Sequence, residues 1–135
     1  GSRGPAAPRR GAMADGDDPD AGAGCSGPGG AVAVDAPLYE AQTDFQHLLV
    51  FRSDRLGTCM ALDGVLQSTE QDEHIYHEFL VHVPLGLHPA PERVLVCGGG
   101  PGGAAREALR VPSVRDVLVA ELDPAVVAAS RRFTP

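Results

Sequence analysis

The sequence predicts an α/β protein in which a small antiparallel β-domain precedes the first units of a parallel, helix-covered sheet. Three observations support this prediction. Short β-rich segments joined by turn residues occupy the stretch from 46 to 68. Two apolar runs, 93–97 and 115–121, each lead into a stretch that favours a helix. A glycine-rich loop follows the first of these runs. Strands that alternate with helical segments indicate βα units and a parallel sheet.

The N-terminal segment is predicted to be a disordered tail. Residues 1–36 contain 9 glycines, 9 alanines and 4 prolines and no aromatic residue. Such a segment buries too little apolar surface to offset the entropy lost on ordering. We therefore expect order to begin near Leu38, with a β-meander domain over 37–70 and the start of a nucleoside-binding Rossmann-like domain, truncated, over 71–135.

Three strands are expected in the β-domain, over 46–52, 58–62 and 65–68. Asp63 and Gly64 separate the last two, and both positions of a two-residue hairpin turn favour positive φ. A helix should then begin near residue 70, capped by Thr69 with Asp72 or by Ser68 with Gln71. Pro84 should kink or end this helix. Apolar residues recur at helical spacing along it: Tyr76, Leu80, Val83 and Leu87.

The second half should form a strand over 93–97, a helix over 103–109, a strand over 115–121 and a second helix. Asp123 and Pro124 open that last helix, since aspartate is a preferred N-cap and proline suits the first helical position. A doubly wound sheet needs more than the roughly two βα units present here. We therefore expect the C-terminal part of the domain to be missing.

The glycine loop predicts a nucleoside-cofactor site. Gly98, Gly100 and Gly103 fit the pattern G-x-G-x-x-G directly after an apolar strand. Glycine permits the tight turn, the approach of a ligand to the backbone and close packing of the next helix. Glu121 closes the next strand about 20 residues on, where an acidic residue binds ribose hydroxyls in such folds. The alternative is a glycine-rich turn that binds no ligand.

The composition and net charge of the chain disfavour several kinds of binding site and reaction. The net charge of −7 argues against a nucleic-acid groove and suits cationic small molecules. All eleven basic residues are arginine. The 135 residues therefore contain no lysine that could bind phosphate in a phosphate loop or form a Schiff base with pyridoxal phosphate. The three cysteines form no C-x-x-C pair, and we expect them to be reduced and structural. No metal site, signal peptide or membrane span is expected, and the predicted location is the cytoplasm.

From about residue 38 to 135 the sequence resembles the N-terminal third to half of a spermidine synthase, of the polyamine aminopropyltransferase family. The resemblance lies in the order and spacing of four blocks: 46–53, 62–73, 76–78 and 93–103. It implies a β-domain ahead of a Rossmann-like domain of the class I methyltransferase type, here incomplete. The implied reaction, a step of polyamine biosynthesis, transfers an aminopropyl group from decarboxylated S-adenosylmethionine to putrescine, giving spermidine and methylthioadenosine. The resemblance also implies a homodimer or homotetramer when the protein is full-length.

The resemblance assigns roles to individual residues. Glu121 would bind the ribose hydroxyls, the loop with Gly98, Gly100 and Gly103 would line the nucleoside, and Gln46 would contact it. The residues beside the polyamine would be Tyr76 and His77, with Gln67 lining the cleft. Simpler readings stay open: Gln46 as a strand residue facing water, and Tyr76 as a core residue. His77 and His74 have helical spacing, but no third ligand follows, so no metal is expected.

Two departures from the family pattern matter. Pro101 stands where the family loop has the aspartate that holds the amino group of the aminopropyl arm, and proline offers no charge. The family's catalytic aspartate would lie beyond Pro135, so no catalytic residue is assigned and we expect the 135-residue chain alone to be inactive. Two alternatives remain: an S-adenosylmethionine-dependent putrescine N-methyltransferase-like enzyme, and a non-catalytic homologue.

Overall fold

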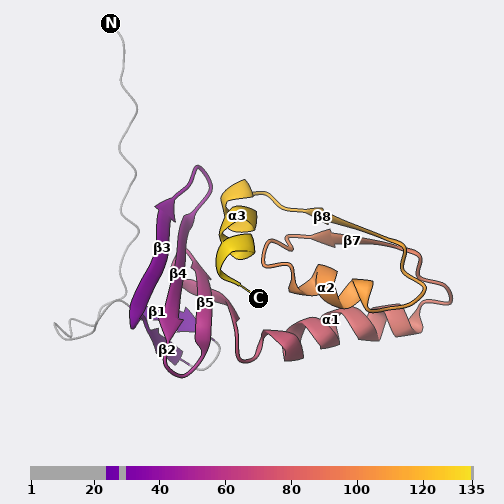
Figure 1. Cartoon of the computed structure of the whole chain (residues 1–135), viewed down its shortest axis with the longest axis horizontal. Coiled ribbons are helices and arrows are strands. Elements are labelled where there is room, and N and C mark those ends of the chain that lie inside the picture. Colours follow the sequence, from indigo (N-terminus) through magenta and orange to yellow (C-terminus); the bar gives the residue numbers. More distant parts are fainter. Residues whose placement is uncertain (1–23, 28–29, 135) are drawn as a thin grey trace, which may run out of the picture.

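A computed structural model describes residues 24–27 and 30–134 of the chain (Figure 1). Its elements, in chain order, are β1 (Gly24–Gly27), β2 (Gly30–Ala33), β3 (Ala36–Gln42), β4 (His47–Ser53), β5 (Gly57–Leu62), β6 (Val65–Thr69), α1 (Glu73–Leu87), β7 (Arg93–Cys97), α2 (Gly103–Leu109), β8 (Asp116–Ala120) and α3 (Pro124–Phe133). The predicted fold class is confirmed, because a mostly antiparallel sheet precedes a parallel pair of strands with helices.

The first sheet has six strands in the order β2-β1-β6-β5-β4-β3. The predicted meander forms its centre as β4, β5 and β6, paired antiparallel. Asp63 and Gly64 both have positive φ in the turn between β5 and β6, as the sequence predicted. The sheet is antiparallel except where Ser26 of β1 pairs with Val65 of β6 in parallel.

Residues 24–27 and 30–33 correct the prediction of a disordered tail over 1–36. They form β1 and β2 and add two strands at the edge of the sheet beside β6. Cys25 is buried with Phe51 and Cys59, and Val32 packs against the same cluster. The composition of this segment does not show that β6 offers a free edge for pairing or that an apolar cluster can bury Cys25. Residues 1–23, 28 and 29 lie outside the described part of the chain.

Helix α1 continues through Pro84 and ends at Leu87. Of the two expected effects of Pro84, a kink or an end, the helix therefore does not show the end, since a proline near the C-terminus of a helix removes only one hydrogen bond. The predicted apolar stripe does not form the packed face: Tyr76 is 64% exposed and Leu87 82%. The buried residues of α1 are instead His77 and Val81. The expected pairing of Thr69 with Asp72 does precede the helix, through two hydrogen bonds.

The parallel sheet consists of β7 and β8, in register from Arg93 opposite Asp116 to Cys97 opposite Ala120. Ala104 and Ala108 of α2 form a buried cluster with Val81, and the inner valines of β7 and β8 pack against this cluster. Alanine allows the helices and the sheet to approach closely. The opposite face of the pair carries exposed leucines, Leu95 and Leu118.

Helix α3 joins the two sheets. Its Val126 and Ala129 are buried against Leu48, Val50 and Met60 of the six-stranded sheet, and Figure 1 shows α3 beside β4 and β5. This packing brings the end of β8 close to the start of β4, although the two are far apart in the sequence. No helix in the described ranges, 24–27 and 30–134, has both the length and the apolar character needed to cross a bilayer.

Candidate functional site

An open pocket of about 490 Å³, called here the loop pocket, lies between the glycine loop and α3. Its lining consists of residues 99–102 of the loop, Val119 and Glu121 at the end of β8, and Val127, Ser130, Arg131 and Thr134 of the α3 region. It therefore lies outside the carboxyl ends of two parallel strands, where open α/β sheets bind their ligands.

Glu121 is held rigidly at the edge of the loop pocket. Its Oε2 accepts a hydrogen bond from the Gly100 N–H at 2.8 Å, and its Oε1 accepts one from the Asp123 N–H at 3.1 Å. An ionised carboxylate has about four acceptor sites, so capacity for ligand hydroxyls remains. Gly100 has no room for a side chain, since a Cβ there would lie within 3.0 Å of Val126 Cγ1 and 2.9 Å from Glu121 Oε2.

The three motif glycines have different roles. Only Gly100 lines the loop pocket. Gly98 has a φ of +72° and donates its N–H to the Ala120 carbonyl at 2.8 Å. It therefore forms the turn after β7 and does not line the loop pocket. Gly103 is buried at the start of α2, where a Cβ would lie within 3.0 Å of His77 Nδ1. The structure thus does not bring Gly98 and Gly103 to the pocket surface.

Gln46 does not line the loop pocket, but it is linked to Glu121 through Asp123. Gln46 Nε2 donates to Asp123 Oδ2 at 3.0 Å, and Thr43 Oγ1 donates to the same oxygen at 2.8 Å. Asp123 Oδ1 accepts from the Ala125 N–H at 2.9 Å, which confirms the predicted N-cap. Gln46 is therefore not simply a strand residue that faces water. Burial opposes the ionisation of Asp123, but the bonds from Gln46, Thr43 and Ala125 outweigh it and lower the pKa of its carboxyl.

The three residues predicted to contact a polyamine lie together on a second open pocket of about 360 Å³, called here the α1 pocket. Gln67, Tyr76 and His77 all line it. Tyr76 lies edge-on to the His77 ring, with centroids 5.3 Å apart, and is largely exposed rather than a core residue. Gln67 is exposed in the middle of β6, and its Nε2 donates to the Val65 carbonyl at 3.2 Å.

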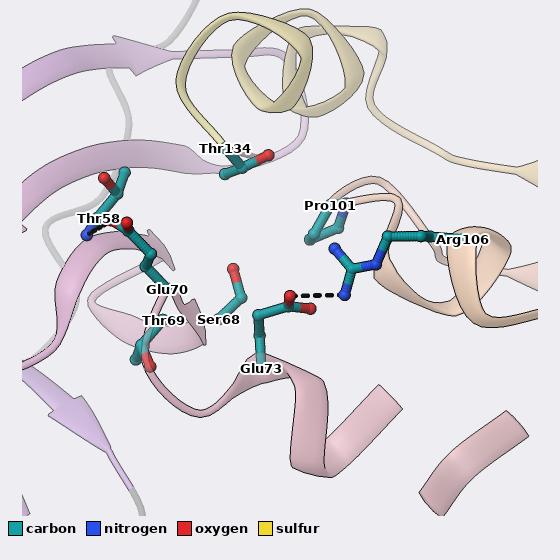
Figure 2. Close-up of a pocket in the computed structure, with 8 residues that line it drawn as sticks. All are labelled: Thr58, Ser68, Thr69, Glu70, Glu73, Pro101, Arg106 and Thr134. Carbon is teal, nitrogen blue, oxygen red and sulfur yellow. Dashed lines mark hydrogen bonds and ion pairs between the residues drawn. The ribbon is translucent and has the colours of Figure 1, made fainter. Parts of the chain in front are cut away.

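A small cavity of about 20 Å³, called here the junction, shares lining residues with both pockets (Figure 2). It shares Pro101 and Thr134 with the loop pocket and Ser68, Thr69 and Glu73 with the α1 pocket. Figure 2 shows Glu73 rising from α1 toward Arg106, with Pro101 beside the guanidinium. The loop pocket and the α1 pocket therefore both border on the junction.

An ion-pair network crosses the junction. Glu73 Oε2 lies 2.6 Å from His77 Nδ1, and Glu73 Oε1 accepts from Arg106 Nη2 at 2.6 Å. Arg106 Nε in turn donates to Glu107 Oε1 at 3.1 Å. Hydrogen bonding to Glu73 raises the pKa of Arg106. This network joins α1 to the helix that follows the glycine loop.

Glu107 is fully buried at the far end of the network. Besides Arg106, Arg110 Nη1 donates to both of its oxygens at 2.9 and 3.0 Å, and His82 Nε2 lies 3.2 Å from Oε2. Burial opposes the ionisation of Glu107, but these hydrogen bonds outweigh it and lower the pKa. Neither Glu107 nor Arg106 was predicted from the sequence; the only local signal is a charged pair within a short alanine-rich helix.

Two family models match this chain. A spermidine synthase tetramerisation domain matches residues 25–70, and a spermine/spermidine synthase domain matches residues 73–135. Spermidine synthase of Dictyostelium discoideum is 45% identical over 105 residues, which are 78% of this chain and 37% of the relative. Polyamine aminopropyltransferase 1 of Pseudomonas aeruginosa is 47% identical over 109 residues, 81% of this chain and 38% of the relative.

The solved structures that resemble this chain are also spermidine synthases. The crystal structure of spermidine synthase from Thermotoga maritima has a TM-score of 0.74 and 42% identity, covering 76% of this chain and 36% of that chain. A crystal structure of spermidine synthase in complex with the transition state analogue AdoDATO has the same TM-score and identity, with 76% and 35% covered. The chain thus spans a little over a third of the length of the curated relatives that it matches.

Proposed function

Because this chain belongs to the spermidine synthase family of polyamine aminopropyltransferases, we propose that its protein transfers an aminopropyl group from decarboxylated S-adenosylmethionine to putrescine. The products are spermidine and methylthioadenosine. The observation that carries the proposal is that a pocket built on the glycine loop and a pocket lined by Gln67, Tyr76 and His77 border on the same small cavity, the junction.

The loop pocket is proposed to hold the nucleoside sulfonium. Glu121 would accept hydrogen bonds from the ribose hydroxyls, since its carboxylate is fixed by two backbone N–H groups and retains free acceptor sites. Gln46 supports this edge through Asp123. The α1 pocket would hold putrescine, with the exposed Tyr76 ring offering an aromatic face to a cation.

The proposed step is a displacement at carbon. A neutral amine nitrogen of putrescine attacks the aminopropyl carbon bonded to the sulfonium sulfur. The C–N bond forms as the C–S bond breaks, and the bonding electrons stay on sulfur, which leaves as neutral methylthioadenosine. The new ammonium then loses one proton to a base, a role that we assign to none of the residues of either pocket. Holding the two substrates in line at one junction is the contribution proposed for this chain.

The proposal includes self-association and a cytoplasmic location. The six-stranded sheet falls within the region that matches the tetramerisation domain, so a homodimer or homotetramer would form through it. Cys25, Cys59 and Cys97 are all free thiols, as is usual in a reducing compartment.

Turnover by the full-length protein tests the proposal. Incubation with putrescine and decarboxylated S-adenosylmethionine should release methylthioadenosine and spermidine in equal amounts. Glu121→Ala should lower this activity, while Glu40→Ala, on an exposed side chain of β3, should not. Absence of methylthioadenosine above background would contradict the proposal.

Pro101 supports a second candidate, an S-adenosylmethionine-dependent putrescine N-methyltransferase-like enzyme. Proline at this position lines both the loop pocket and the junction and has no carboxylate of its own to bind an ammonium group. Arg131 lines the loop pocket as well and could face the carboxylate of the undecarboxylated cofactor. Calorimetry with the two cofactors separates the candidates, because tighter binding of the decarboxylated form excludes the methyltransferase.

The third candidate is a non-catalytic homologue. In that case Pro101→Asp in the full-length protein would produce no gain in activity.

A further inference from the structure

The ring of His77 is held from two sides. Its Nδ1 lies 2.6 Å from Glu73 Oε2, one helical turn earlier on α1. The ring also packs on the start of α2, where a Cβ at Gly103 would lie within 3.0 Å of Nδ1 and Cε1. The side chain is only 11% exposed. The imidazole therefore has a fixed place and a fixed hydrogen-bonding partner.

Glu73 is in turn held by α2. Arg106 Nη2 donates to Glu73 Oε1 at 2.6 Å (Figure 2), and Arg106 is itself fixed by the buried Glu107. An arginine can only donate hydrogen bonds, so the contact with Arg106 determines which oxygen of Glu73 faces α2. The other oxygen is left to face His77.

These contacts determine where the proton of a neutral His77 ring lies. The ionised carboxylate of a glutamate only accepts hydrogen bonds. His77 Nδ1 must then be the donor in the contact with Glu73. In a neutral imidazole the other nitrogen, Nε2, is left as an acceptor, and Nε2 makes no hydrogen bond to any residue in the described ranges.

We propose that Glu73 is a positioning residue that holds His77 as its Nδ1–H tautomer, so that Nε2 accepts a hydrogen bond from an amine in the α1 pocket. Arg106 is the support that keeps Glu73 in this orientation. The tautomer follows from the contacts alone, whereas the amine as ligand rests on the proposed function.

The tautomer of the neutral ring is measured on the ¹⁵N-labelled protein by long-range proton–nitrogen spectra, recorded at rising pH until the ring nitrogen shifts no longer change. The ring nitrogen shifts should identify Nδ1 as protonated and Nε2 as bare. In Glu73→Gln the amide oxygen should face Arg106, which turns the amide NH₂ toward His77. Nδ1 then becomes the acceptor, and the ring should switch to the Nε2–H form.

A matched control exists in the β-domain. His47 Nε2 lies 2.8 Å from Glu40 Oε1 in an exposed pair, and Glu40→Gln should leave the His77 spectrum unchanged. The proposal is overturned if His77 of the unaltered protein is the Nε2–H tautomer, a result that needs no variant to fold. It is also overturned if a folded Glu73→Gln protein keeps the Nδ1–H form.

Putrescine added to the full-length protein tests the second half of the proposal. The Nε2 resonance of His77 should shift on saturation, and the shift should be lost in Glu73→Gln. An unchanged Nε2 resonance at saturating putrescine would overturn the role in amine binding. Both measurements are independent of turnover, so their failure is distinguishable from failure of the proposed reaction.

Discussion

Gly103→Ala is the sharpest test of how the two pockets are built. Gly103 begins α2 and is buried. A Cβ at this position would lie within 3.0 Å of His77 Nδ1 and 2.7 Å from Glu73 Oε2. Neither neighbour can move freely, because Glu73 is also bonded to Arg106. The methyl group would therefore force α1 and α2 apart.

The size of the effect follows from three contributions. Loss of a hydrogen bond to a charged group costs about 1.5–3 kcal/mol. Overpacking of a close contact costs about 1–3 kcal/mol. Alanine in place of glycine within a helix returns up to about 1 kcal/mol. We expect a net loss of about 1.5–6 kcal/mol in the free energy of unfolding.

Urea unfolding followed by far-UV circular dichroism measures this change, with the slope checked for constancy between variants. Gly86→Ala is the matched control, because Gly86 lies within α1 with nothing within 4 Å of its Cβ position. That variant should be stabilised by up to about 1 kcal/mol. If Gly103→Ala lies within about 0.5 kcal/mol of the unaltered protein, as a surface substitution would, the close packing argued here is refuted.

Three further predictions concern the loop pocket. Glu121→Ala should weaken methylthioadenosine binding to the full-length protein by about tenfold or more, measured by calorimetry, because charge-assisted hydrogen bonds are lost. Pro101→Asp should favour decarboxylated S-adenosylmethionine over S-adenosylmethionine by about 10- to 100-fold more than the unaltered protein does, since it supplies a carboxylate for the free ammonium group. Asp123 has a folded-state pKa below its ordinary value; its contribution to stability should be complete above the unfolded pKa of about 3.9 and lost as pH falls through the lower folded pKa. Asp123→Asn should flatten this part of the pH–stability curve.

Each of these predictions has a contrary outcome. Unchanged nucleoside affinity in Glu121→Ala would remove the ribose role of that residue. Equal binding of both cofactors by Pro101→Asp would show that position 101 does not face the aminopropyl arm. A pH–stability curve that is the same in Asp123→Asn as in the unaltered protein would show that the bonds from Gln46 and Thr43 do not stabilise the ionised form.

The elements with strong local signals could be predicted from the sequence. Strand β7, helix α2 and the N-cap of α3 occur where the apolar runs, the glycines and the Asp123-Pro124 pair predicted them. These signals are local because a strand, a tight turn and a helix start each depend on a few consecutive residues. The ribose-binding role of Glu121 rests on the same kind of local signal, because this residue follows the second strand of a βα unit, and it stays a prediction.

Only the tertiary structure decided which residues meet. Gln46 and Asp123 are 77 positions apart, and Glu73 and Arg106 are 33 apart; no local pattern records such pairs. Burial on α1 was likewise decided by packing against α2, which favours the face of His77 and Val81 over the stripe that begins at Tyr76. Periodicity shows that a helix has apolar residues on a face, whereas the partners that remove a face from water are set by the whole fold.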